Sequence, residues 1–463
     1  MSFASLEFLL FFSVVLIAVA ILQRMKTSFY KELFLLIASY LFYGYWDWRF
    51  CFLLLFVTGT AYITALFTKR KVALVLGITV PLIVLGFFKY FNFFLDSFSG
   101  LIHKEMDVLS IILPVGISFY TFQALSYVLD VKRGKIEAEK NFIRMALYIS
   151  FFPQLVAGPI VKAADFLPQL KEDRRITLRN LEVGLQQFVF GLFKKIVLSD
   201  HLSVFVDDVF NVPTAFSWGT IVLAVISYSM QIYLDFSGYS DMAVGCAKCL
   251  GYDFLPNFNI PYISENVTVF WRRWHISLST WLKEYLYIPL GGNRKGKVRQ
   301  YINLFITMLL GGLWHGANWT FVFWGALHGA ALSIDKVLPK KNKNNMIVKG
   351  INIALTFTFV SFAWIFFRSE NFLKASQVIT GIVTLQKGIV QPFFWTFITL
   401  GVVGIATLIA VVQSKKRGEK AANGFYPILD LKTVPGLTVF FIVCGLILCL
   451  AFTGEHPFVY FQF

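Results

Sequence analysis

The sequence predicts an all-α polytopic integral membrane protein with about 11 transmembrane helices, joined by short re-entrant and interfacial helices. Of the 463 residues, 57% are hydrophobic and only 15% are charged. A soluble domain is typically about one quarter charged. Apolar segments recur along the whole chain, and several approach the roughly 20 residues that a spanning helix needs. The chain has too little polar surface to coat a fold of this size in water, so we expect lipid to surround it.

The apolar segments follow one another without an intervening soluble domain, low-complexity linker or internal repeat. We therefore expect a single domain that covers residues 1–463. Two segments, 143–158 and 238–250, are short and are predicted to be partial or re-entrant elements. The longer ones lie at residues 6–22, 33–46, 51–67, 72–88, 108–129, 183–198, 216–234, 301–313, 317–335, 347–367, 391–412 and 434–452.

The charge is strongly positive and unevenly distributed. Lysine and arginine number 42 against 26 acidic residues, for a formal charge of +16. The basic residues sit in short runs between apolar segments, at 69–71, 132–133, 174–175, 340–341 and 415–417. This pattern is typical of cytoplasmic loops that face anionic lipid. Membrane lipid is therefore an expected partner, and nucleic acid is not.

The same loops predict the orientation of the chain. No basic residue precedes Arg24, so the N-terminus is expected to be extracytoplasmic, and the count of spans places the C-terminal tail at 458–463 there too. Segment 143–158 breaks the alternation, because basic residues at 132–135 and at 171–179 both favour the inside. Pro153 and Pro159 would also interrupt a helix there. A segment that starts and ends on one side is re-entrant or interfacial.

A second break in the alternation surrounds His315. The basic residues at 294–299 and 336–343 both favour the inside, and about 35 mostly apolar residues separate them. One helix of that length would measure about 52 Å, against a hydrocarbon core of about 30 Å. The middle of the segment reads GGLWHGAN at residues 311–318. The sequence therefore predicts two helices that meet at a turn within the membrane, with His315 at the turn.

His315 is the first candidate catalytic residue. An ionisable side chain at membrane depth is costly and is by default functional. Neutral imidazole is also the commonest general base for a hydroxyl. The alternative is a structural histidine that bonds a backbone carbonyl at the helix break.

His275 is the second candidate, within FWRRWHISLSTWL at residues 270–282. On one helix, six apolar and aromatic residues would share an arc of about 100°, while Arg272, Arg273 and Lys283 fall outside it. This predicts an amphipathic interfacial helix with His275 at the border of its two faces. Either the helix is a surface anchor, or Arg272 and Arg273 meet an anionic substrate while His275 enters a pocket. The six residues are Trp271, Trp274, Leu278, Trp281, Leu282 and Tyr285.

Other polar residues are weaker candidates. His328 would lie about 140° around a continuous helix from His315, so it is interpreted as structural. Asp235 and Asp241 flank Gly238 and are interpreted as caps of a helix break or as lining of a substrate cavity. Cys246 and Cys249 form a single CxxC pair that is interpreted as core thiols. His103, His201 and His456 lie in predicted loops or ends.

Motifs for metals and nucleotides are missing from the sequence. It contains no HExxH, no Walker A motif and no GxGxxG, so neither a metal nor a permanently bound cofactor is expected. It also lacks the GxSxG elbow of α/β-hydrolases.

Residues 270–282, the run YLYIPLGGNR at 285–294 and GLWHG at 312–316 resemble the signature of the membrane-bound O-acyltransferases. QIYLDFSGYSD at 231–241 and YFQF at 460–463 are similar too. The resemblance is densest over about 110–335, which implies a catalytic core there. It is strongest to the bacterial branch that contains the membrane subunits for O-acetylation of alginate and peptidoglycan.

The resemblance implies that His315 is the family's essential histidine and that His275 is its second active-site position. It also implies a central tunnel, with the acyl donor entering from the cytoplasmic side. Trp314 or Asn318, each close to His315, could donate a hydrogen bond to the oxyanion. Arg272 and Arg273 would suit the phosphates of coenzyme A or an acidic carrier protein, as would Arg294 and Lys295. Asp241 is a further candidate substrate-binding residue.

The implied function is transfer of an acyl group, expected to be acetyl, from a cytoplasmic thioester such as acetyl-CoA to hydroxyls of an extracytoplasmic polysaccharide. The protein would lie in the bacterial cytoplasmic membrane and act directly or through a periplasmic esterase-like partner. Three alternatives stay open: D-alanyl transfer from a carrier protein towards lipoteichoic acid, a non-enzymatic transporter, and a scaffold that only anchors a periplasmic partner.

Overall fold

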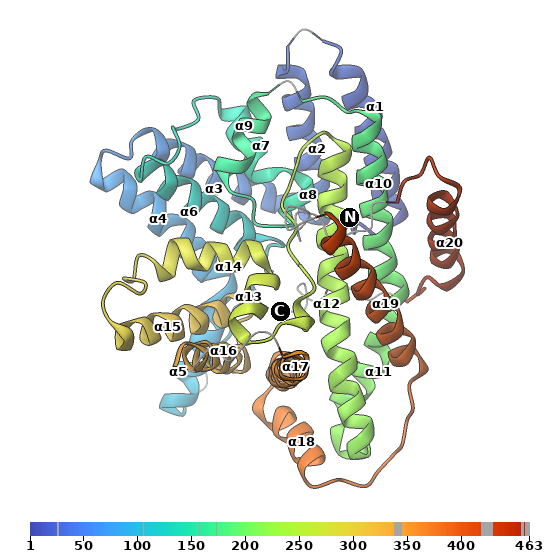
Figure 1. The fold of residues 1–463 in the computed structure, drawn as a ribbon. Coiled ribbons are helices and arrows are strands. Elements are labelled where there is room, and N and C mark those ends of the chain that lie inside the picture. Colours follow the sequence, from blue (N-terminus) through green and yellow to red (C-terminus); the bar gives the residue numbers. More distant parts are fainter. Residues whose placement is uncertain are drawn as a thin grey trace. The chain divides into compact units, whose positions relative to one another are not determined.

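The computed structural model describes residues 1–25, 27–104, 106–156, 158–172, 174–337, 345–417, 429–454 and 458. The basic residues predicted at 340–341, His456 and the tail at 459–463 lie outside these ranges. Nearly all regular structure is helical (Figure 1), and within the described ranges the β contact is an isolated bridge between Phe216 and Ile389. The predicted all-α class is confirmed.

The chain divides into two compact units, and the divisions fall within helices α10 and α12 and in the loop after α12. Unit 1 comprises residues 1–188 and 239–255, and unit 2 comprises residues 189–238 and 256–463. The helices of unit 1 are α1 (Leu6–Leu22), α2 (Phe29–Asp47), α3 (Arg49–Leu66), α4 (Lys71–Leu85), η1 (Gly86–Tyr90), α5 (Phe91–Ile102), α6 (Ile117–Lys132), α7 (Phe142–Ser150), α8 (Phe152–Leu155), α9 (Ala163–Lys171) and most of α10 (Leu178–Leu192).

Unit 2 holds the remaining helices and most of α12. They are η2 (Phe193–Ser199), α11 (Asp200–Asn211), η3 (Pro213–Ala215), α12 (Trp218–Cys249), η4 (Pro261–Ile263), α13 (Val267–Arg273), α14 (Ile276–Leu282), η5 (Lys283–Tyr287), α15 (Lys297–His315), α16 (Trp319–Val337), α17 (Met346–Arg368), α18 (Phe372–Val383), α19 (Phe394–Arg417) and α20 (Val434–Leu450).

Several helices have the length and apolar composition of membrane spans. Within the described ranges, four stretches meet both requirements: Arg49–Leu66, Lys71–Ile102, Trp218–Cys249 and Met346–Arg368. Shorter apolar helices include α1, α18 and α20. The total of about 11 spans stays a prediction, because length and composition do not decide which shorter helices cross the bilayer.

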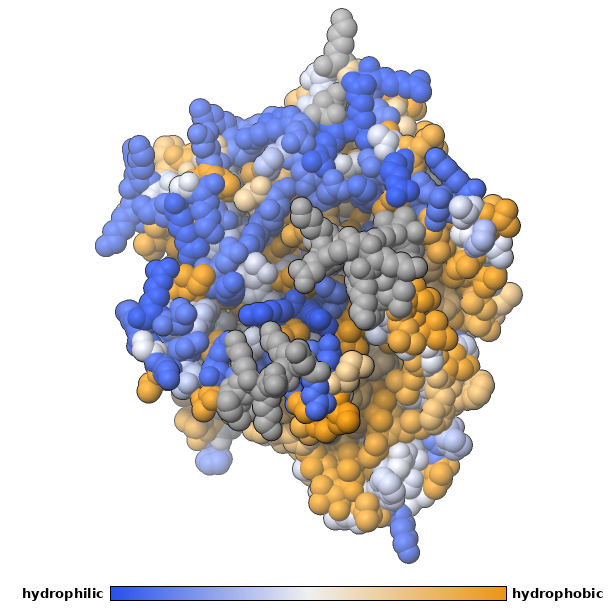
Figure 2. All heavy atoms as spheres, viewed as in Figure 1, coloured by the Kyte–Doolittle hydropathy of each residue, from blue (hydrophilic) through white to orange (hydrophobic). Residues whose placement is uncertain are grey.

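Unit 2 presents an apolar outer surface around α11 and α19. Figure 2 shows hydrophobic residues, in orange, gathered over these helices. Exposed apolar residues of α11 and α19 include Val204, Phe394, Phe397, Ile405 and Leu408. A contiguous apolar surface of this kind is expected where lipid covers the protein.

The core of unit 1 is aromatic. The Phe8 ring lies 5.9 Å from that of Phe42 and 6.3 Å from that of Phe152, and all three side chains are buried. α1 begins at Ser5, whose hydroxyl accepts a hydrogen bond from the backbone N–H of Phe8. Because α1, α2 and α8 each contribute one ring, aromatic packing fixes these three helices against one another.

The segment after α6 brings its two ends close together, and its interpretation as a re-entrant or interfacial element stays a prediction. α7 ends at Ser150, and α8 has only four residues, with Pro153 in its first turn. Glu139, before α7, forms a 3.0 Å ion pair with Lys171, the last residue of α9. The two ends of the segment are therefore neighbours. This agrees with the basic residues at 132–135 and 171–179, which both favour the inside.

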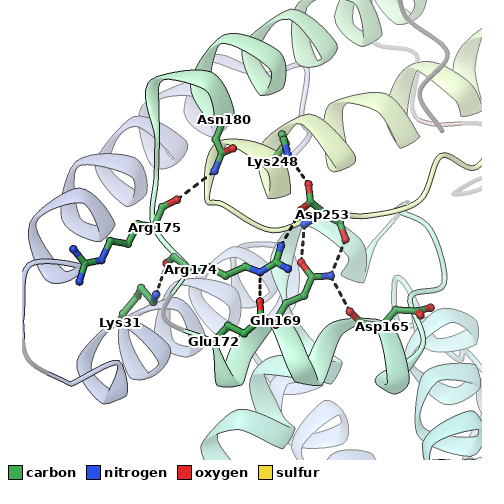
Figure 3. Close-up of polar contacts among 9 residues, drawn as sticks. All are labelled: Lys31, Asp165, Gln169, Glu172, Arg174, Arg175, Asn180, Lys248 and Asp253. Atoms are coloured by element: carbon green, nitrogen blue, oxygen red, sulfur yellow. Dashed lines mark hydrogen bonds and ion pairs between the residues drawn. The ribbon is translucent and has the colours of Figure 1, made fainter. Parts of the chain in front are cut away.

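A polar cluster joins the chain after α9 to the loop after α12 (Figure 3). Arg174 Nη1 lies 2.8 Å from Asp253 Oδ2, and Gln169 exchanges two hydrogen bonds with the backbone of Asp253. Burial raises the pKa of Asp253, but hydrogen bonds from Lys248 and Arg174 outweigh it and leave that pKa below its ordinary value. Lys31 Nζ donates to the carbonyl of Arg174 at 2.7 Å. Lys31 and Arg174, which lie far apart in the sequence, thus meet.

The predicted break at Gly238 is wrong, because α12 continues from Trp218 to Cys249. A Cβ at Gly238 would lie 2.7 Å from the carbonyl oxygen of Gly191. The glycine therefore allows α12 to pack closely against α10, which excludes the interpretation of Asp235 and Asp241 as caps of a break. Cys246 and Cys249 are free and buried on the same helix, as expected for core thiols.

Asp235 belongs instead to a buried ionic triad. Lys195 Nζ lies 2.7 Å from Asp235 Oδ1 and 2.8 Å from Asp200 Oδ1. The three side chains are at most 8% exposed. Lys195 comes from the π-helical turn η2, while the two carboxylates come from α11 and α12, so the lysine links three elements.

Replacing Lys195 with methionine is expected to lower the free energy of unfolding by about 3–5 kcal/mol, because two carboxylates would remain buried without their cation. Asp200→Asn is the matched control and should cost less, since the pair of Lys195 with Asp235 survives. Thermal unfolding of both variants in detergent checks this expectation. Equal stability of Lys195→Met and the unsubstituted protein would contradict it.

Candidate functional site

The predicted turn at His315 is confirmed. α15 ends at His315, Gly316 is extended with φ −159° and ψ 151°, and α16 begins at Trp319. Asn318 lies at the start of α16, where its Oδ1 accepts hydrogen bonds from the backbone N–H of Thr320 at 3.0 Å and from its hydroxyl at 3.2 Å. The turn places His315 at the closed end of a helical hairpin.

The imidazole of His315 is enclosed by rings. The side chain is 3% exposed. Its ring centroid lies 5.0 Å from Trp314, 5.1 Å from Trp324 and 5.3 Å from Phe367. The ring of His275 lies 6.4 Å away. The structure thus brings together the two histidines that the sequence selected, within one unit and out of bulk water.

His275 does not lie on a continuous helix, so the predicted single amphipathic helix over 270–285 is wrong. α13 ends at Arg273, α14 begins at Ile276, and His275 between them has φ 42° and ψ 57°, in the left-handed region. The reversal buries the side chains of both Trp274 and His275, each 0% exposed. A surface anchor is therefore excluded for His275, and the alternative that it enters the interior is supported.

The remaining candidates for substrate contact are Trp314, Asn318 and Asp241. Trp314 is buried, and its ring centroid lies 6.0 Å from His275 and 5.0 Å from His315. Asn318 is engaged in the hairpin, since its Nδ2 also donates to the carbonyl of Glu370 at 2.7 Å. Asp241 is buried in the part of α12 that belongs to unit 1, so its role as a substrate ligand stays a prediction.

The basic candidates lie at the surface. Arg272 is exposed and Arg273 is half-buried at the end of α13. Arg294 and Lys295 are exposed in the loop before α15. These side chains are therefore accessible to an anion, and their role in binding one stays a prediction.

His328 packs among tryptophans, and its interpretation as a structural residue stays a prediction. Its Nδ1 accepts a hydrogen bond from Trp271 Nε1 at 3.2 Å, and the side chain is fully buried. Its ring also contacts Trp324 at 4.8 Å. His328 therefore supports the tryptophan that packs directly on His315.

Three residues of this site were missed by sequence reasoning: Asn257, Trp324 and Phe367. Asn257 Oδ1 lies 3.2 Å from His275 Nδ1. It occupies a loop between α12 and η4 that has no periodicity, and no motif singles it out. Trp324 and Phe367 lie on α16 and α17, where aromatic residues are common and carry no signal of their own. Within the described ranges, no group of three or more His, Cys, Asp or Glu could hold a metal ion.

Comparison with known proteins supplies the family context. The model of the membrane-bound O-acyltransferase family matches residues 135–373. A probable alginate O-acetylase of Pseudomonas syringae is 43% identical over 395 residues, covering 82% of this chain and 74% of the relative. A peptidoglycan O-acetyltransferase of Helicobacter pylori is 38% identical, covering 78% and 75%. A teichoic acid D-alanyltransferase of Bacillus subtilis is 27% identical, covering 56% and 69%.

Proposed function

The chain belongs to the membrane-bound O-acyltransferase family and is a multi-pass membrane acyltransferase, and from this premise we propose that it transfers acetyl groups to hydroxyls of an extracytoplasmic polysaccharide. The names of its relatives with 38–43% identity support the acetyl group and a polysaccharide such as alginate or peptidoglycan. The observation that carries the proposal is the buried pairing of His315 with His275.

His315 is proposed as the general base. The hydroxyl oxygen of the acceptor attacks the thioester carbonyl, and His315 takes the hydroxyl proton. The carbon–sulfur bond then breaks, and the proton passes to the leaving thiolate. The imidazole at the closed end of the α15–α16 hairpin is held by aromatic packing, so it can be positioned before substrate arrives.

The developing oxyanion needs a hydrogen-bond donor. Of the two proposed, Trp314 is the better supported, because it is buried against both histidines. The amide of Asn318 already caps α16 and binds the carbonyl of Glu370. A role for Asn318 at the acyl group would require these bonds to be exchanged.

The acyl donor is proposed to be acetyl-CoA, with no permanently bound cofactor. The exposed basic side chains at Arg272, Arg294 and Lys295 and the half-buried Arg273 suit its phosphates. We further propose about 11 spans around a central tunnel, in the bacterial cytoplasmic membrane, with both termini extracytoplasmic. The transfer to the polymer would be direct or would be completed by a periplasmic esterase-like partner.

The chain is proposed to act as one catalytic domain over residues 1–463, with its core at about 110–335. The family match over 135–373 supports this, because it includes parts of both units. D-alanyl transfer is the second candidate, favoured by the 27% identity to a teichoic acid D-alanyltransferase.

Labelled donors distinguish the two candidates. Membranes that contain the protein are incubated with acetyl-labelled acetyl-CoA or with D-alanyl-labelled carrier protein, and the exported polysaccharide and lipoteichoic acid are then isolated. Label from acetyl-CoA in polysaccharide is the expected result. Label that enters lipoteichoic acid from the carrier alone would replace the proposal with the second candidate.

A further inference from the structure

The hydrogen bonds around Asn257 fix the orientation of its amide. Its Oδ1 accepts from the backbone N–H of Ser277 at 3.1 Å and from the Ser277 hydroxyl at 2.9 Å, and it lies 3.2 Å from His275 Nδ1. A backbone N–H can only donate, so the atom that faces it is the amide oxygen and not the nitrogen.

The orientation of this amide determines the tautomer of His275. The Asn257 oxygen carries no hydrogen, so the contact is a hydrogen bond only if Nδ1 of His275 carries the proton. The side chain is 0% exposed, and burial disfavours the imidazolium form. A neutral imidazole has one N–H, which leaves a lone pair on Nε2. That atom is buried and has no hydrogen-bond partner within the described part of the chain.

The backbone around Asn257 holds the same turn. The carbonyl of Asn257 accepts from the N–H of Ile276 at 2.8 Å, and the N–H of Asn259 donates to the carbonyl of Arg273 at 2.9 Å. These two hydrogen bonds hold the residues on both sides of the turn at His275. A left-handed conformation outside glycine costs free energy and persists where surrounding contacts determine it. The loop that carries Asn257 and Asn259 therefore holds the turn at His275.

We infer that Asn257 is a positioning residue that keeps the proton of His275 on Nδ1, so that Nε2 accepts a hydrogen bond from a hydroxyl of the acceptor. This inference rests on the proposed function, in which His315 and His275 share one site. It assigns His275 the role of a neutral acceptor. The oxyanion must then be stabilised by another group, because Nε2 has no hydrogen to donate.

The tautomer can be measured without any substrate. Protein labelled with ¹⁵N-histidine is compared with His275→Gln in detergent, and the difference identifies the His275 nitrogens. We expect Nδ1 to be protonated and Nε2 unprotonated, and Asn257→Leu should populate the other tautomer. A proton on Nε2 in the unsubstituted protein would overturn the inference, whatever the enzyme proves to transfer.

Kinetics test the consequence for catalysis. Asn257→Leu removes the acceptor and should lower kcat about tenfold or more, with a smaller change in KM. Asn257→Asp keeps the acceptor but adds a charge that favours the imidazolium, so the acid limb of the kcat profile should move up by about one pH unit or more. Ser279→Ala removes a hydrogen bond to the carbonyl of Trp274 but none to Asn257 or His275, so its kcat should stay within about twofold as the matched control.

The outcomes separate this inference from the proposed function. If label from acetyl-CoA does not enter polysaccharide, the proposed function fails and the tautomer measurement stands alone. If His315→Ala is inactive but Asn257→Leu keeps its kcat, or Asn257→Asp keeps the unsubstituted pH profile, Asn257 does not position His275. If Asn257→Leu fails to fold, two measurements decide whether Asn257 positions His275. They are the pH profile of kcat for Asn257→Asp and the ¹⁵N-histidine spectrum of the unsubstituted protein.

Discussion

Replacing His315 with alanine is expected to lower acetyl transfer by about 10²- to 10⁴-fold, the usual contribution of a positioned general base. The chain should still fold, because the substitution removes no backbone hydrogen bond of the α15–α16 hairpin. Some stability will be lost with the ring contacts to Trp314, Trp324 and Phe367. The measurement is the rate of label transfer from acetyl-CoA in membranes, normalised to folded protein.

The variant His315→Asn tests the same prediction, and His103→Asn is its matched control. His315→Asn keeps a polar side chain at the turn but removes the base, so it should be about as inactive as the alanine variant. His103 is exposed and has φ 52° at the end of α5, a conformation that asparagine tolerates. His103→Asn should therefore transfer at the unsubstituted rate. A folded His315→Asn or His315→Ala protein with the unsubstituted rate would remove His315 from the mechanism.

The turn at His315 could be predicted because its signals are local. An apolar stretch that is too long for one spanning helix, basic residues at both its ends and glycines in its middle all lie within one part of the sequence. The helix at 6–22 was likewise predicted with the bounds that α1 has, since a continuous apolar run between polar ends suffices for it.

The turn at His275 could not be predicted in this way. Helical periodicity over 270–285 describes the side chains but contains no information about Asn257 and Asn259, whose backbone bonds interrupt the helix. The interpretation of Gly238 as a helix break was wrong for a related reason. It was interpreted by its local tendency to end a helix, whereas its role is set by the approach of α10, which adjoins α12 only after folding. Long-range contacts decided both cases.

Gly312→Val is expected to destabilise the protein by about 3 kcal/mol or more, because no space exists for the added side chain. A Cβ at Gly312 would overlap the carbonyl oxygen of Phe321 and lie 3.1 Å from both Cα and N of Gly325. These are backbone atoms, which cannot move aside as a flexible side chain could. Helices α15 and α16 would have to separate where their backbones now touch, as small residues permit in membrane helices.

Gly312→Val should lower the rate of acetyl transfer as well as the stability of the fold. Gly312 precedes His315 by less than one turn of α15, so parting the hairpin moves the imidazole away from Trp324, which lies on α16. Gly350→Val in α17 is the matched control, since a Cβ there has no atom within 4 Å, and it should change the unfolding temperature little. Thermal unfolding in detergent and transfer rates of both variants give the comparison. If Gly312→Val is as stable and active as Gly350→Val, backbone contact between α15 and α16 does not hold His315 in place.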